Sequence, residues 1–171
     1  MKKLSFRGRA WLKGLHLFLI CAWIGAGISM LVLGFAKQQT TNGDELYAIN
    51  AAIKLIDDFI VIPAAIGTLL TGLLFSLFTN WGFAKFYWVI VKWFMTIGQM
   101  LFGTFFLGPW VNGATFIADT RRVQALQDAT YLYYSQMNQY LGILQVSLLV
   151  VVVFISVLKP WGKRERINIE K

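Results

Sequence analysis

The stretch that decides the fold runs from Leu15 to Ala36 and reads LHLFLICAWIGAGISMLVLGFA. Its 22 residues include no acidic residue, lysine or arginine. An apolar run of about 20 residues is long enough to cross the hydrocarbon core of a bilayer as a helix. Basic residues precede it, as they do in a secretory signal peptide, but the run exceeds an ordinary signal-peptide core. We therefore interpret it as a retained membrane span.

The whole chain has the composition of an integral membrane protein. Of its 171 residues, 57% are hydrophobic and only 14% are charged, whereas a typical soluble domain is about 25% charged. The net charge of +8 arises mainly beside the first and last apolar runs, so we expect no nucleic-acid partner. The flanking basic residues are Lys2, Lys3, Arg7, Arg9, Lys13, Lys159, Lys163, Arg164, Arg166 and Lys171. They predict cytoplasmic termini in a multi-pass protein of the inner (cytoplasmic) cell membrane, with the lipid bilayer as its first partner.

Three further apolar segments follow, and four crossings return the chain to its starting side. The expected spans cover residues 10–36, 58–78, 86–108 and 140–158. We place Asp57 and Asp58 at the outer end of the second span and expect the third to stop at Pro109. Residues 111–139 are expected to form an external, partly helical segment. The fold class is therefore all-α, a four-transmembrane-helix bundle forming one membrane domain over residues 1–171.

The only histidine, His16, lies inside the first span, where an ionisable side chain is costly and indicates a functional site. At the rise of an α-helix, it lies about 8 Å from the interfacial Trp11, and Lys92 lies about 10 Å from Lys85 in the third span. The two side chains therefore share a depth in the inner leaflet, and we predict that they share a site. In the alternatives, His16 bonds to a carbonyl or water, and Lys92 extends its ammonium to the interface.

A haem site would explain the surroundings of His16. Haem needs an axial ligand, an apolar slot and small residues beside the macrocycle. His16 supplies the imidazole, Trp23 follows on the same helical face, and Gly25 and Gly27 leave room for a flat ligand. We accordingly predict that His16, Lys92, Trp23, Gly25 and Gly27 bind haem.

The second axial ligand stays open in the sequence. Lys92, Met95, a partner subunit's His16 or no residue at all could occupy that position. A copper site has less support, because Met30 lies about 21 Å from His16 along the same helix and Cys21 points to another face. No cluster of residues matches a zinc site.

Three motifs carry a resemblance to a known group of proteins. They are WLKGLH at residues 11–16 with the later Trp23 and GAG at residues 25–27, PAAIG at residues 63–67, and WVIVK at residues 88–92. Together they resemble the first three helices of the HemJ and copper-resistance D (CopD) group of small membrane proteins. They are also similar to an uncharacterised bacterial family of four-helix membrane proteins. The resemblance covers roughly residues 10–110.

HemJ-like proteins bind haem b and oxidise protoporphyrinogen, so the resemblance implies His16 as the axial ligand with Lys92 in the same site. HemJ-like third helices carry a further Tyr-His pair where this chain has MLFG at residues 100–103. The resemblance therefore supports haem binding more than it supports the oxidase reaction.

Three functions are consistent with the sequence. The first is a haem-b redox protein linked to porphyrinogen oxidation or electron transfer, with a redox partner or quinone. The second is a non-enzymatic membrane protein without a cofactor, such as a small transporter or an accessory subunit. The third is a CopD-like copper importer. The sequence leaves open whether the protein is an enzyme and whether it forms a homo-oligomer.

Overall fold

The computed structural model describes residues 3–79 and 82–162, and these form long helices without a strand. The prediction of an all-α bundle is confirmed. In chain order the elements are α1 (Phe6–Lys37), α2 (Gly43–Ile56), η1 (Asp57–Val61), α3 (Ile62–Phe78), α4 (Tyr87–Phe102), η2 (Gly103–Leu107), α5 (Gly108–Arg121), η3 (Arg122–Gln127) and α6 (Ala129–Leu158).

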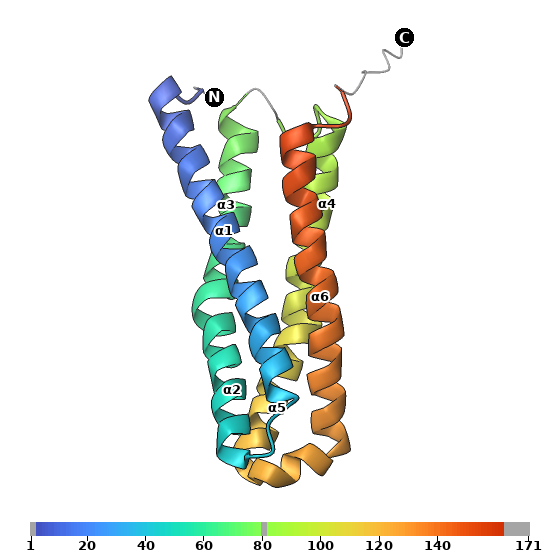
Figure 1. Cartoon of the computed structure of the whole chain (residues 1–171). Coiled ribbons are helices and arrows are strands. Elements are labelled where there is room, and N and C mark those ends of the chain that lie inside the picture. The colour runs from blue at the N-terminus through green and yellow to red at the C-terminus, as the bar shows by residue number, and fades with distance from the viewer. Residues whose placement is uncertain (1–2, 80–81, 163–171) are drawn as a thin grey trace.

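Several of these elements join end to end, so the described chain contains four long rods (Figure 1). The rods are Phe6–Lys37, Gly43–Phe78, Tyr87–Gln127 and Ala129–Leu158, and each is long and apolar enough to cross a membrane. The start of α1 and the end of α6 lie at one end of the bundle, which we call the terminal end. The α1–α2 connection and η3 lie at the other end, which we call the loop end. Which end faces the cytoplasm stays a prediction, and Lys2 and residues 163–171 lie outside the described residues.

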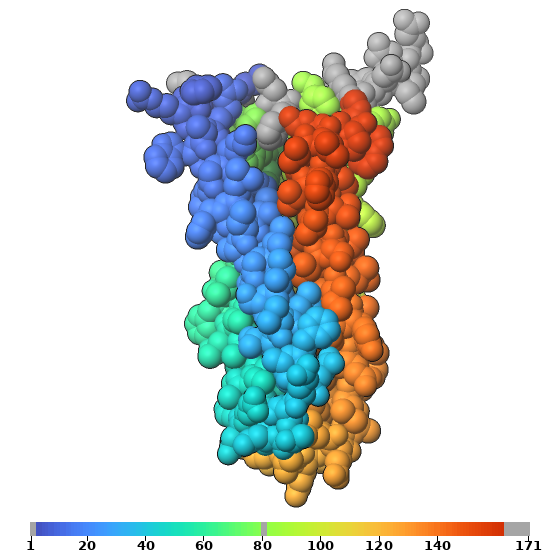
Figure 2. All heavy atoms as spheres, viewed as in Figure 1, coloured from blue at the N-terminus to red at the C-terminus, as the bar shows by residue number. Residues whose placement is uncertain are grey.

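The rods are not equally close along their length. Helix α1 packs on α3 and α6, and α4 packs on α6. In the space-filling view, α1 and α6 touch along the middle of the molecule and diverge toward the terminal end (Figure 2). The four rods therefore enclose a common interior mainly in the middle and toward the loop end.

The helices are longer than the predicted spans. The second rod begins at Gly43, so Asp57 and Asp58 lie inside it and not at its outer end. The third rod continues past Pro109 to Gln127, and α6 already begins at Ala129. Residues 111–139, predicted to be a partly helical external segment, are therefore almost wholly part of two rods. The predicted helix ends were wrong because polar side chains can face the bundle interior without ending a helix, whereas the external position of residues 111–139 stays a prediction.

Both interior prolines follow a π-helical turn. Such a turn, η1, precedes Pro63, and η2 precedes Pro109. In each case the amide after the turn, that of Ile62 or of Gly108, donates to a carbonyl five residues earlier. A proline inside a regular α-helix clashes with the carbonyl four residues before it, and the wider turn moves that carbonyl away. This is why Pro109 does not end the helix.

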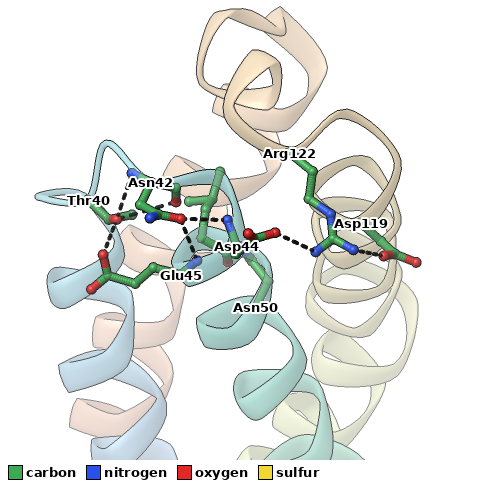
Figure 3. Close-up of polar contacts among 8 residues, drawn as sticks. Thr40, Asn42, Asp44, Glu45, Asn50, Asp119 and Arg122 are labelled. Carbon is green, nitrogen blue, oxygen red and sulfur yellow. Dashed lines mark hydrogen bonds and ion pairs between the residues drawn. The ribbon is translucent and has the colours of Figure 1, made fainter.

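Polar contacts close the loop end (Figure 3). The Asn42 side chain caps α2 by accepting from the amides of Asp44 at 2.8 Å and Glu45 at 3.2 Å. Arg122 then connects η3 to its neighbours, with ion pairs to Asp119 at 3.0 Å and Asp44 at 3.8 Å. Helix α2 is thereby joined to the end of the third rod.

Candidate functional site

A central cavity of about 440 Å³ lies among the four rods. The part of the cavity nearer the terminal end is lined by Trp23, Ala65 and Leu149. These residues pack with Ala64 in one buried apolar cluster. Toward the loop end it reaches Lys37 on α1. Its polar lining consists of Lys37, Asn50, Asp57, Asp58, Gln99, Thr104, Asn112, Ser135, Asn138, Gln139 and Gln145.

Both π-helical turns contribute to this cavity. Asp57, Asp58 and Val61 of η1 line it, as do Gly103 and Thr104 of η2. Wide turns of this kind recur at functional sites, because they interrupt the regular ladder and re-aim side chains. In this protein they bring two carboxylates and a threonine to the wall of the cavity.

Two glutamines in the middle of the cavity wall lack hydrogen-bond partners. Gln99 on α4 is 6% exposed, and neither its amide nitrogen nor its amide oxygen is paired within the described chain. The amide oxygen of Gln145 on α6 is unpaired in the same way. Burying an unpaired amide is unfavourable, so these atoms are the groups that a polar ligand would satisfy. A second, apolar cavity of about 300 Å³ between α4 and α6 is also lined by both glutamines.

Lys37 forms the loop end of the cavity. It is the last residue of α1 and is 5% exposed. Its Nζ donates to Asn50 Oδ1 over 3.3 Å and lies 6.0 Å from the centre of the Tyr131 ring. The Asn50 amide nitrogen in turn donates to Leu46 O at 2.8 Å and to the Tyr131 hydroxyl at 3.1 Å. The side-chain oxygen and nitrogen of Asn50 are thus both hydrogen-bonded, whereas the Lys37 ammonium has N–H donors left over.

The two carboxylates in the cavity differ in their pairing. Asp58 forms an ion pair of 2.7 Å with Lys54, one helical turn earlier. The carboxylate of Asp57 has no ion pair or hydrogen bond within the described chain, and both Asp57 and Asp58 are half-buried. The negative charge that remains in this part of the cavity is therefore mainly that of Asp57.

His16 lies in a separate polar layer nearer the terminal end. Its Nδ1 is 2.6 Å from the Thr71 hydroxyl on α3, and that hydroxyl donates to Gly67 O at 2.7 Å. The edge of its ring packs on Phe75, with ring centres 5.5 Å apart. Since Thr71 uses its own proton on the carbonyl, Nδ1–H is the donor to Thr71 and Nε2 carries the free lone pair.

Lys92 on α4 is not bonded to His16. Within the described chain, no hydrogen bond joins its ammonium to the imidazole. The Lys92 Nζ lies 5.7 Å from the centre of the Trp88 ring. That His16 and Lys92 share a site stays a prediction.

The other predicted site residues lie elsewhere. Trp23 is 3% exposed and, with Gly27, lines the central cavity. A Cβ on Gly27 would lie 2.8 Å from Val146, so this glycine allows close approach of α6, not of a flat ligand. Gly25 faces outward, and nothing lies within 4 Å of the position its Cβ would take. The structure therefore divides the predicted set between two layers and the outer surface.

The sequence analysis missed the principal residues of the cavity. Neither Lys37 nor Gln99 is among the site residues predicted from the sequence. The signal that could have indicated the cavity is the presence of uncharged amides inside two predicted spans, at Gln99 and Gln145. Side chains of this kind inside a span usually face the bundle interior.

The chain matches no protein-family model, no curated protein and no solved structure. Within the described residues, no three His, Cys, Asp or Glu side chains gather as a metal-ion site would require. The fold and site therefore define a class: a multi-pass helical membrane protein with a polar cavity inside its bundle.

Proposed function

We propose that this protein is a small transporter that binds a polar solute in the central cavity and carries it across the membrane. The observation that carries the proposal is Gln99, a buried amide at the cavity wall whose polar atoms are both unpaired. A polar group inside a bilayer needs a partner, and the cavity volume lies in the usual range of about 300–1,000 Å³ for small-molecule sites.

The surrounding residues divide the work of binding and closure. Gln99 and Gln145 supply an amide donor and two carbonyl acceptors to a solute. The apolar cluster around Trp23 separates the solute from the His16 layer and the terminal end. Passage then requires the rods to move apart at this cluster. The π-helical turns beside it interrupt the regular helix of the second and third rods.

Uptake by proteoliposomes tests this proposal. The purified full-length protein would be reconstituted and supplied with radiolabelled gluconate, choline or mannitol, which are polar and cross bilayers poorly. We expect uptake of at least one solute above that of protein-free vesicles, and a loss of roughly tenfold or more in Gln99→Leu, which has lost a buried polar contact. Gln136→Leu, an exposed glutamine on α6, is the matched control and should transport normally. Uptake of none of the three, or full uptake by Gln99→Leu, would contradict the proposal.

A second candidate is the haem-b redox protein expected from the sequence, and one geometric observation favours it. Metal-bound histidines usually donate their other ring N–H to a fixed acceptor, as Nδ1 of His16 does to Thr71. His16 thus fits an axial ligand, and Lys92 fits a neighbouring cation for a propionate. Trp23, Gly25 and Gly27 do not fit as walls of the same slot, because they lie in other parts of the bundle. Bound haem would supply one-electron redox chemistry, and Thr71 would hold the imidazole in one orientation.

The absorbance spectrum of the purified protein tests this candidate. A haem ligated by His16 predicts a Soret band that shifts or disappears in His16→Ala and persists in Gly25→Ala. Protein expressed with sufficient haem that shows no Soret band, or a band unaffected by His16→Ala, would exclude His16 as its ligand. The two candidates use different layers of the bundle, so each test leaves the other intact.

A further inference from the structure

We infer that the solute carried in the central cavity is a small organic anion whose carboxylate is bound by the ammonium of Lys37. This inference rests on the proposed transport function and names the class of its substrate. It starts from a buried charge. Lys37 is 5% exposed at the cavity wall, and no carboxylate of the described chain lies within ion-pair distance of it.

The hydrogen bonding of Lys37 leaves room for an anion. An ammonium has three N–H donors, and within the described chain only Asn50 Oδ1 accepts from one of them. The face of Tyr131 at 6.0 Å attracts the positive charge but takes no strong hydrogen bond. Buried ammonium groups are normally paired, because their desolvation is costly. A carboxylate in the cavity would complete the pairing of Lys37.

The neighbouring contacts hold Lys37 in place for this role. Asn50 is 2% exposed and is fixed by the Leu46 carbonyl and the Tyr131 hydroxyl. Its oxygen therefore meets the ammonium without a change of rotamer. A binding group that is positioned in advance loses less entropy when the ligand arrives.

The acidic residues of the cavity place the anion at one end. Asp58 is neutralised by Lys54. Asp57 lies seven residues after Asn50, which corresponds to roughly 10 Å along the helix. A carboxylate at Lys37 would thus lie away from Asp57, while the hydroxyl or amine donors of the same solute could reach Asp57 or Gln99.

A comparison of the uptake of two matched probes tests the inference. Gluconate and mannitol are both six-carbon polyols and differ mainly in the carboxylate. We expect proteoliposomes to take up gluconate at least tenfold faster than mannitol or choline at equal low concentration. Lys37→Met should raise the half-saturating gluconate concentration by roughly 10- to 100-fold, the range expected for a hydrogen bond to a charged group. Lys37→Arg, which keeps the charge, should restore most of the preference.

Controls separate recognition from folding and from the transport proposal itself. Lys13→Met removes an exposed lysine from the same helix and should leave gluconate uptake unchanged. Elution volume and thermal midpoint in detergent would show whether Lys37→Met is folded, and Lys37→Arg provides the second variant if it is not. Uptake of mannitol or choline equal to that of gluconate, or gluconate uptake independent of Lys37, would overturn the anion while leaving transport intact. Absence of uptake for all three probes would overturn transport as well.

Discussion

Polar side chains inside the bundle are paired differently in its two halves. Toward the loop end, Lys37, Asn50 and Tyr131 form a connected buried network beside an open cavity. Toward the terminal end, His16 and Thr71 form a small closed pair on adjacent helices. The cavity half presents donors and acceptors that lack partners, whereas the histidine half positions one imidazole with its Nδ1 already used.

This difference shows why the lone histidine did not lead to the central cavity, which His16 does not line. A titratable residue stands out in an apolar sequence, but Thr71 already satisfies one of its nitrogens. The cavity depends on amides and on one lysine at a helix end, which stand out less. The four variants below test whether the halves are independent, in order of decreasing expected effect.

The largest effect is expected for Asn50→Leu. This change removes the acceptor of Lys37 and the partner of the Tyr131 hydroxyl, so a buried ammonium loses its one hydrogen bond. A hydrogen bond to a charged group is worth about 1.5–3 kcal/mol, and the bond to the Tyr131 hydroxyl is lost as well. We expect a clear fall in the unfolding midpoint in detergent, and no change at His16.

Asn138→Leu is the matched control for that variant. Asn138 also lines the cavity, but the hydrogen bond of its side chain goes to Tyr134 O on its own helix. Asn138→Leu should therefore lower the free energy of unfolding by about 1 kcal/mol or less. Equal effects of the two variants would show that the Lys37 network is not the special feature of this half.

Gly43→Ala should follow in magnitude. A Cβ at Gly43 would collide with the backbone nitrogen of Val123 and lie 2.8 Å from the Cβ of Arg122, and neither atom is the end of a flexible side chain. We expect a loss of roughly 1–3 kcal/mol, as for other overpacked positions. Gly25→Ala, which meets nothing within 4 Å, should be neutral or slightly stabilising in the same unfolding assay. A larger loss in Gly25→Ala would mean that its outer face is covered by another molecule.

In the histidine half, Thr71→Val should cost about 1 kcal/mol by removing the hydroxyl that contacts His16. Thr68→Val provides an internal contrast one turn away. The Thr68 hydroxyl is buried without a partner in the described chain, so replacing it by a methyl should be neutral or stabilising. Thermal unfolding of both variants measures this contrast, and gluconate uptake should be unchanged in both. Reduced uptake in Thr71→Val would show that the two halves are coupled.

The smallest effect concerns pH and Asp128, which caps α6 outside the spans. The Tyr131 amide donates to this carboxylate at 2.9 Å and, with the ion pair to Arg121, holds its pKa below the ordinary 3.8. A carboxyl whose pKa is lower in the folded state stabilises the fold above its unfolded pKa. That contribution is lost as the pH falls through the folded value.

We therefore expect the thermal midpoint of the wild type to fall slightly more than that of Asp128→Asn between pH 6 and pH 3, buffer values chosen to bracket this transition. Asp44→Asn, whose carboxylate is 91% exposed, should follow the wild type more closely. An equal fall in the thermal midpoint of the wild type and of Asp128→Asn would show that protonation of Asp128 does not affect stability.

The sequence predicted the architecture well because the length of an apolar run can be counted directly along the chain. Four runs of sufficient length suffice to predict four rods. The interior could not be predicted in the same way. Whether Gln99 meets a partner or a cavity depends on how α4 is rotated against α1 and α6, and short-range patterns do not carry that information.

The π-helical turns were the other unpredicted feature, since Pro109 was expected to end its helix. A proline in an apolar run has two outcomes, a stop or a widened turn. The choice depends on whether the residues after it can pack. Val111, Ala114 and Ala118 do pack, because each is buried on the inner side of α5.

A π-helical turn also sets the angular phase of everything that follows it. Such a turn amounts to one extra residue in an α-helix, and each residue turns the chain by about 100°. If the residues of η1 closed as a regular α-helix instead, α3 would be rotated by about that angle. Thr68 and Thr71 would leave the interior and face lipid. The π-helical turn therefore decides which side of α3 faces the bundle interior.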